Sequence, residues 1–389
     1  MKSYLRYLNR KFTLNEKVLL AIFASAFISV YAVILAAVFL PIYITVTKQW
    51  KYVLVPTLEN LLLCVFWLLV MVVTAIYGDT KSILLAVCLA FGVVGVLFFS
   101  RAMTRQVFVP CLTLSCYLSV ISFIVALFQW IMLKTTEHGV RFHSVFVNPN
   151  YYGTVIEIVV LFAIYCLLKE QRKERRLVFY IVIAVNIAGL ILTQCRTAYI
   201  VIILTVPLLL AVVDKNFLYL YAALFVLFIG ALVFFPDLLP RLHTIVTDYD
   251  RRRDLWVAAW NAFTTHPIFG QGCIAYSRLY SAYGGPSGVH AHNIFLELLL
   301  NFGVVGTALF VTVIGLNMSK IASIYKHRIA QRKFALSLSV LAAVIIHGML
   351  DITFFWPQTA VLVIGVLFYS RNYEFEDVPI GDPSQVKIQ

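Results

Sequence analysis

A histidine pair next to a late hydrophobic segment offers the clearest acid-base chemistry in the sequence. The segment reads His290-Ala291-His292-Asn293, and a long apolar run follows it directly. An imidazole titrates near neutral pH, so His292 at the mouth of a helix is suited to accept a proton from an attacking hydroxyl. Asn293 would cap that helix or orient the histidine. The alternative is a plain interfacial histidine at a membrane boundary.

A carboxylate late in the chain is a candidate partner for this histidine. Asp351 follows His347 at the expected outer end of a hydrophobic segment. A carboxylate beside a histidine fixes its tautomer and stabilises the imidazolium that forms when it takes a proton. Unless Asp351 meets His292, a capping or interfacial role explains it better.

Two groups of arginines are candidates for binding an anionic ligand. Arg196 stands between two apolar runs, where burying its charge costs about 2.5–3.5 kcal/mol on insertion scales. The run Arg251-Arg252-Arg253 lies on the outer side by the predicted topology, where fewer arginines are expected. A guanidinium binds two phosphate oxygens at once, so a diphosphate is a suitable ligand. The alternatives are snorkelling of Arg196 and binding of lipid headgroups by the triplet.

Other polar residues near these centres are candidates for contacting a donor or an acceptor. Asn148-Pro149-Asn150 opens a helix whose free N–H groups face outward, although structural capping accounts for it as well. A glycine loop for nucleotides, metal-ligand spacing and a nucleophile elbow are missing from the sequence, which favours transfer without metal or cofactor. We assign possible binding roles to Asn148, Asn150, Arg141, Arg253, Trp256, His290 and Asn293.

The composition shows which solvent surrounds the elements that position these residues. The 389 residues are 62% hydrophobic and 13% charged, whereas soluble domains carry about 25% charged residues. The formal net charge of +13 comes mostly from basic residues in short loops beside apolar runs, so nucleic acid is not an expected partner. The cysteines are scattered, and only Cys195 and Cys273 are placed to meet outside. We predict one all-α integral membrane domain over residues 1–389.

Two basic loops predict the orientation of this domain. The stretches 171–176 and 320–333 are rich in Lys and Arg, which marks the cytoplasmic side. The chain then has about twelve spans, both termini inside, and a long extracytoplasmic loop over 236–292, whose amphipathic stretch Asp254 to Phe263 could lie along the membrane interface. The expected spans are a hairpin within 18–46, then 53–77, 82–100, 107–133, 149–168, 177–194, 198–213, 216–235, 293–316, 334–350 and 356–370.

Taken together, the motifs between about residues 141 and 357 resemble those of the O-antigen ligase and O-antigen polymerase family of bacterial membrane enzymes. The N-terminal third matches that family only as hydrophobic spans. Asn148-Pro149-Asn150, the arginine turn at Arg196 and the late acidic residue Asp351 support the likeness. The most specific features are His292-Asn293 followed after nine residues by Gly303-Val304-Val305-Gly306, Arg252 four residues before Trp256, and the loop motif 266–272.

The resemblance implies a fold like that of the C-type membrane glycosyltransferases. It also implies a glycan-transfer reaction. A glycan would pass from an undecaprenyl diphosphate carrier to an acceptor hydroxyl with inversion and without metal. In that scheme Arg196 and Arg252 hold the diphosphate, His292 deprotonates or positions the hydroxyl, and Asp351 orients His292. The donor, a lipid or glycan acceptor and membrane lipid would be the partners. The enzyme would sit in the bacterial cytoplasmic (inner) membrane, with its active site facing the periplasm or the cell exterior.

Two other functions fit parts of the sequence. A polymerase would extend one carrier-linked chain with another, whereas a ligase hands the glycan to a different acceptor. The modest length and single large outer loop lean toward a ligase. A flippase or transporter of lipid-linked glycan would also have a dozen or so spans, but it would be expected to show internal repeats or broken charged helices.

Overall fold

The computed structural model describes residues 12–133, 140–213, 245–326 and 331–368, with isolated positions between 214 and 244. Seven helices in this part of the chain are long and apolar enough to cross a membrane. The predicted all-α, multi-pass membrane protein is therefore confirmed. The basic residues up to Lys11, most of the predicted span 216–235 and the first part of the loop 236–292 lie outside the described residues. The single domain over 1–389 stays a prediction.

The first apolar stretch is divided into two short helices, as the hairpin prediction requires. A capping box between Thr13 and Glu16 begins α2 (Leu14–Ser25), and Ser29 caps α3 (Val30–Val46) by accepting from the N–H of Ala32 at 3.1 Å. Because Ser29 adopts an extended conformation, one continuous span over 18–46 is excluded. The chain continues through α4 (Trp50–Val53), α5 (Leu58–Tyr77), α6 (Thr80–Ala102) and α7 (Arg105–Leu133).

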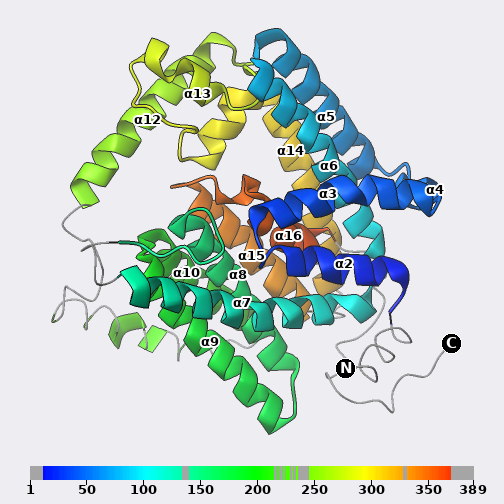
Figure 1. The fold of residues 1–389 in the computed structure, drawn as a ribbon, viewed down its shortest axis with the longest axis vertical. Coiled ribbons are helices and arrows are strands. Elements are labelled where there is room, and N and C mark those ends of the chain that lie inside the picture. The colour runs from blue at the N-terminus through cyan, green and yellow to red at the C-terminus, as the bar shows by residue number, and fades with distance from the viewer. Residues whose placement is uncertain are drawn as a thin grey trace.

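The centre of the molecule is α8 (Pro149–Lys169). About 83% of its most apolar window is buried inside the protein, whereas less than half is buried in each other long apolar helix of the described residues. An all-round apolar helix in this position packs against several neighbours. These neighbours include α7, α9 (Lys173–Thr193), α10 (Arg196–Val213) and α15 (Gln331–Gly348), as Figure 1 shows.

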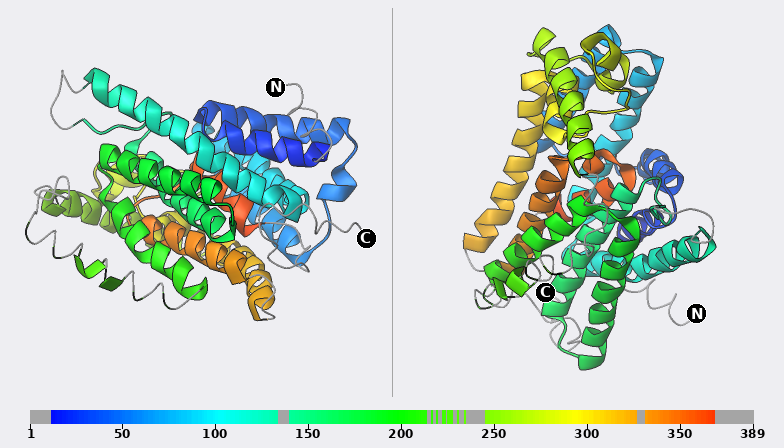
Figure 2. Two further views of the ribbon diagram at one scale, coloured as in Figure 1. Left: turned by 90° about the horizontal axis from the view of Figure 1, so that it is seen from below. Right: turned by 90° about the vertical axis from the view of Figure 1, so that its left-hand side faces the viewer.

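One end of the molecule combines elements from the second half of the chain with the turn between α5 and α6, where Arg278 donates to the carbonyl of Tyr77 and His266 packs on the Tyr77 ring (Figure 1). α12 (Ile245–Thr265) lies beside α14 (Ile294–Lys326), and α14 packs against α15 (Figure 2). The predicted amphipathic stretch of α12 buries its apolar face against protein: Leu255, Ala258 and Ala262 pack with α13 (Ala275–Leu279) and the start of α14. The remaining elements are η3 (Tyr280–Tyr283), η4 (Thr353–Phe355) and α16 (Pro357–Leu367).

A break in α14 holds the loop motif 266–272 in place. Gly303 has φ 63° and ψ −171°, so the helix changes direction there. The freed N–H groups of Val304 and Val305 donate to the carbonyls of Pro267 and Ile268 at 2.8 and 3.0 Å. A side chain at Gly303 would overlap the Ile268 carbonyl, so glycine is required by both conformation and space. The Gly-x-x-Gly pattern therefore docks a loop through Gly303.

The prediction that Cys195 and Cys273 could meet was wrong. Cys195 and Cys273 are both buried and free. Cys195 packs against Gly153 of α8, whereas the N–H of Cys273 donates to the hydroxyl of Thr74 in α5 at 3.1 Å. The two thiols are thus held by different helices.

Candidate active site

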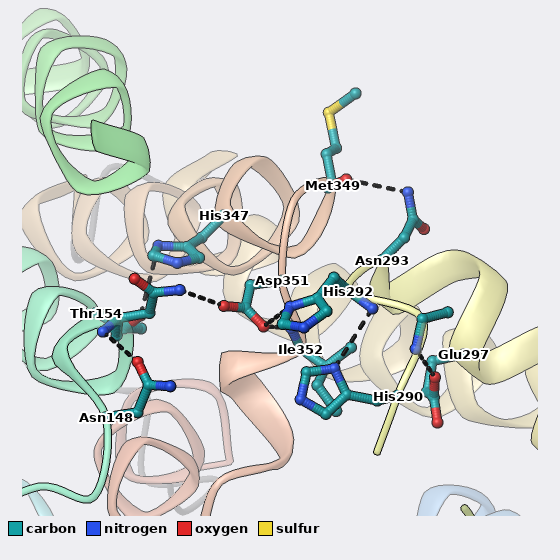
Figure 3. A network of polar contacts seen from close by, with 12 residues as sticks. Asn148, Thr154, His290, His292, Asn293, Glu297, His347, Met349, Asp351 and Ile352 are labelled. Atoms are coloured by element: carbon teal, nitrogen blue, oxygen red, sulfur yellow. Dashed lines mark hydrogen bonds and ion pairs between the residues drawn. The ribbon is translucent and has the colours of Figure 1, made fainter. Parts of the chain in front are cut away.

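The described structure brings His292 and Asp351 together. Nδ1 of His292 lies 3.1 Å from Oδ1 of Asp351, and Figure 3 shows the ring facing the carboxylate. His292 precedes α14 and Asp351 follows α15, so the packing of these two helices joins the residues. The His292 side chain is 36% exposed and that of Asp351 is 4% exposed. One member of the pair therefore meets solvent while the other is enclosed.

Asp351 is held as a carboxylate by the donors around it. Its Oδ2 accepts from Nδ2 of Asn150 at 2.8 Å, and its Oδ1 accepts from the N–H of Ile352 at 2.8 Å. Burial raises the pKa of Asp351, but the hydrogen bond and charge of His292, with the charges of His347 and His290, outweigh burial and hold it well below its usual range. An ionised carboxylate only accepts, so Nδ1 of His292 is the donor. Nε2 is then the nitrogen that can accept a proton.

The orientation of the Asn150 amide is set by Arg141. NH2 of Arg141 lies 2.6 Å from Oδ1 of Asn150, and its Nε donates to the carbonyl of Thr193 at 2.9 Å. A guanidinium can only donate, so the amide oxygen faces Arg141 and the amide N–H faces Asp351. Arg141 and Asn150 were candidates for binding substrate, and the structure places them behind Asp351 as its support. This connection spans 201 sequence positions between Asn150 and Asp351.

The segment before α14 is held in an unusual conformation. His292 has φ 51°, a left-handed backbone that side chains other than glycine rarely adopt. Asn293 caps α14, since its Oδ1 accepts from the N–H groups of Phe295 and Leu296, and its Nδ2 donates to the carbonyl of Met349 at 3.0 Å. Both polar atoms of Asn293 are thus used in structure.

Glu297 is a supporting residue that the sequence interpretation missed. It is 3% exposed, and its carboxylate accepts from the N–H of Ala291 at 2.9 Å and from Nδ2 of Asn301 at 3.0 Å. These bonds tie the histidine segment to the first turns of α14. A carboxylate inside an apolar run is the sequence signal that could have identified it.

A second buried pair lies one turn below the site. Nδ1 of His347 is 2.7 Å from Oε1 of Glu157, and both side chains are almost completely buried between α15 and α8. The hydroxyl of Thr154 is 3.4 Å from the same ring nitrogen. This pair fixes α15 against α8 directly beneath Asp351.

His290 packs against the ring of His292. The two rings lie 4.2 Å apart between centroids at an angle of 60°, and Nδ1 of His290 accepts from the N–H of His292 at 3.4 Å. Burial and the neighbouring His292 lower the pKa of His290 to about 4. His290 is therefore neutral near pH 7. Ligand atoms of His290, His292 and Asp351 all lie within 4.8 Å of one another.

The two predicted diphosphate ligands lie in elements that border this centre. Arg196 begins α10 directly after Cys195, which packs against Gly153 near the start of α8. Arg252 belongs to α12, where it is partly buried. The two arginines thus belong to different helices, and their roles as diphosphate ligands stay predictions.

The remaining candidates occupy more peripheral positions. Asn148 caps α8, because its Oδ1 accepts from the N–H of Asn150 at 2.8 Å. Arg253 is exposed and lies 3.5 Å from Asp254. Trp256 has a buried indole nitrogen without a hydrogen-bond partner in the described structure. Binding roles for these residues stay predictions.

The comparison with protein families bears on this same region. A family model described as O-antigen ligase matches residues 179–311. The matched segment contains Arg196, Arg252, His292 and Gly303, whereas Asn150 and Asp351 join the site from outside it. No curated protein matches the chain. The matching model is thus of the family that the motifs resemble, and it supports glycan transfer of ligase or polymerase type in general.

Proposed function

We propose that this protein is a metal-independent, inverting ligase that moves a glycan from undecaprenyl diphosphate to an acceptor hydroxyl. The contact between His292 and Asp351 carries the proposal, because it supplies an exposed imidazole with a defined tautomer. The match of residues 179–311 to the O-antigen ligase model supports transfer of this general type. The carrier, the ligase direction and the roles of single residues are the proposed part.

The reaction needs one proton acceptor and one site for negative charge. Nε2 of His292 takes the proton of the acceptor hydroxyl as its oxygen forms a bond to the anomeric carbon. The bond from that carbon to the diphosphate oxygen breaks on the opposite face, so the configuration inverts. Asp351 stabilises the imidazolium, which later returns its proton to solvent.

The leaving diphosphate needs positive charge beside it, which the two arginines would supply. Its negative charge grows as the glycosidic bond breaks, and preorganised cations stabilise such charge more effectively than water does. Arg196 begins α10 and Arg252 lies in α12, so the two cations would come from different elements. Together they would hold the diphosphate at the open side of His292.

The distribution of basic residues supports an outward-facing site. α8, α14 and α15 each contribute one end to the site, and the opposite ends adjoin the basic stretches 171–176 and 320–333. Basic loops remain in the cytoplasm in most membrane proteins. The histidine segment would then face the periplasm or the cell exterior.

A transfer assay with purified protein tests the proposal. The protein is incubated with an undecaprenyl diphosphate glycan and separate candidate acceptors in the presence of a chelator, and products are resolved by size. A glycan on the separate acceptor supports a ligase. A ladder that grows on the carrier would mean a polymerase. Movement of donor across vesicle membranes without any transfer would replace the enzyme with a transporter.

A further inference from the structure

We propose that His290, His292 and Asp351 form a binding site for Zn²⁺, and that the bound ion reversibly inhibits glycan transfer. The binding part rests on the geometry of the three side chains. The inhibition rests also on the proposed role of His292 as the proton acceptor.

The three side chains have the composition of an open zinc site. Two imidazoles and one carboxylate are common zinc ligands, and their ligand atoms lie within 4.8 Å of one another. In a tetrahedral site with bonds of about 2.0–2.1 Å, ligand atoms are separated by about 3.4 Å. Nδ1 of His292 and Oδ1 of Asp351, at 3.1 Å, already approach that separation. Only a modest movement of His290 is needed.

Hydrogen bonding in the described structure restrains the His290 ring only weakly. Its one described hydrogen bond, from the N–H of His292, is long at 3.4 Å and contributes little. Because Nδ1 accepts in this bond, its lone pair is unprotonated and ready to bind a metal. Glu297 holds the backbone of Ala291, between the two histidines, so a shift of the ring leaves the segment in place.

The carboxylate is already positioned as a ligand should be. Oδ2 of Asp351 accepts from Nδ2 of Asn150, which Arg141 orients in turn. Such outer contacts fix the direction of a ligating oxygen and strengthen metal sites. The same support that aligns Asp351 with His292 thus prepares it for an ion.

Zinc and catalysis would compete for the same atoms. An ion on Nδ1 of His292 replaces the hydrogen bond to Asp351, and an ion on Nε2 removes the lone pair that accepts the proton. Either arrangement stops proton transfer without changing the fold. The fourth coordination position would be filled by water. Raised Zn²⁺ outside the cell would therefore slow transfer.

The binding test needs no substrate. Chelator-treated protein in detergent is titrated with Zn²⁺ against a fluorescent zinc indicator, and His290→Gln and His290→Ala are compared with wild type. We expect one site whose affinity falls by at least about tenfold in both variants, as loss of a ligand predicts. His266→Ala removes an imidazole from the outer loop but none from the cluster, and it should bind as wild type does.

The transfer assay then tests inhibition, with each variant normalised to its own zinc-free rate. We expect Zn²⁺ to inhibit the wild type, a chelator to restore the rate, and His290→Gln to need at least about tenfold more zinc. Equal zinc binding by wild type and both His290 variants would overturn the site. Loss of wild-type activity on chelation, with recovery on adding zinc, would overturn inhibition and make the ion a cofactor. Because binding is measured without substrate, its failure leaves the proposed transfer untouched.

Discussion

Nδ1 of His292 lies 3.1 Å from Oδ1 of Asp351, although the two residues are 59 positions apart in the sequence. The carboxylate determines the tautomer of the ring, because an ionised Asp351 requires Nδ1–H as the donor. Asp351→Asn preserves the shape but presents an amide that can favour the other tautomer. We expect kcat for transfer to fall by about 10²–10⁴, with a small change in KM. Steady-state kinetics on the purified variant provide the measurement, and an unchanged kcat would remove Asp351 from the mechanism.

Asn150 is a positioning residue for this pair. Its Nδ2 donates to Asp351 at 2.8 Å, and losing a hydrogen bond to a charged group costs about 1.5–3 kcal/mol. Asn150→Leu should therefore lower kcat by about tenfold to a hundredfold, while donor affinity stays within about threefold. Asn317→Leu, far along α14, serves as the matched control and should keep its rate. A rise in KM alone would show instead that Asn150 binds substrate.

Gly303 is expected to be intolerant of any side chain. Its positive φ and its contact with the Ile268 carbonyl make Gly303→Ala strained, with a loss of more than about 1–2 kcal/mol. Gly315→Ala is the matched control in the same helix, because a methyl group there meets nothing within 4 Å. Thermal unfolding in detergent should show a lower midpoint for the first variant and no decrease for the second. Equal midpoints would mean that the docked loop does not require the glycine.

Arg252 and Arg251 are neighbours in α12 with different expected effects. Arg252 is partly buried, whereas Arg251 is exposed. Arg252→Ala should weaken binding of the diphosphate donor by about tenfold or more, and Arg252→Lys should recover part of it. Arg251→Ala should bind donor as wild type does. Titration with undecaprenyl diphosphate is the measurement, and equal affinities of the two alanine variants would contradict the assignment.

Asp79 gives a pH-dependent contribution to stability. It caps α6, and its Oδ1 accepts from the N–H and hydroxyl of Ser82 at 2.8 and 2.6 Å. The side-chain hydrogen bond from Ser82, followed by the backbone one, lowers the pKa of Asp79. Its contribution is therefore present above the ordinary aspartate pKa and is lost as the pH falls through the lower folded value.

Asp79→Asn keeps a good capping residue but removes this titration. Thermal midpoints of wild type and variant should differ at neutral pH and converge as the pH falls below about 4. A difference that stays constant across this range would show that the charge of Asp79 contributes nothing.

Much of the fold could be predicted from the sequence, because the positions and lengths of the apolar runs determine where the long helices lie. The basic loop 171–176 and the apolar runs around it located α8 and α9 correctly. The division of 18–46 was also predicted, and Ser29 supplies its physical cause. The docking of loop 266–272 on Gly303 was not predicted, because backbone contacts between distant segments leave no periodic pattern in the sequence.

The site was predicted in part. Family resemblance named His292 and Asp351, whereas spacing alone left each of them an interfacial alternative. The support from Asn150 and Arg141 could not be predicted, because it depends on how α8 packs against the end of α15. Buried carboxylates in apolar runs, Glu157 and Glu297, were visible in the sequence and both hold structure near the site.

The most direct measurement is the transfer rate of His292→Ala beside that of the wild type, with equal thermal midpoints confirming that both are folded. The proposed proton acceptor is removed while Asp351, Arg196 and Arg252 remain. We predict that the variant binds the undecaprenyl diphosphate donor but transfers its glycan at least about 10²-fold more slowly. Transfer at the wild-type rate would contradict the account.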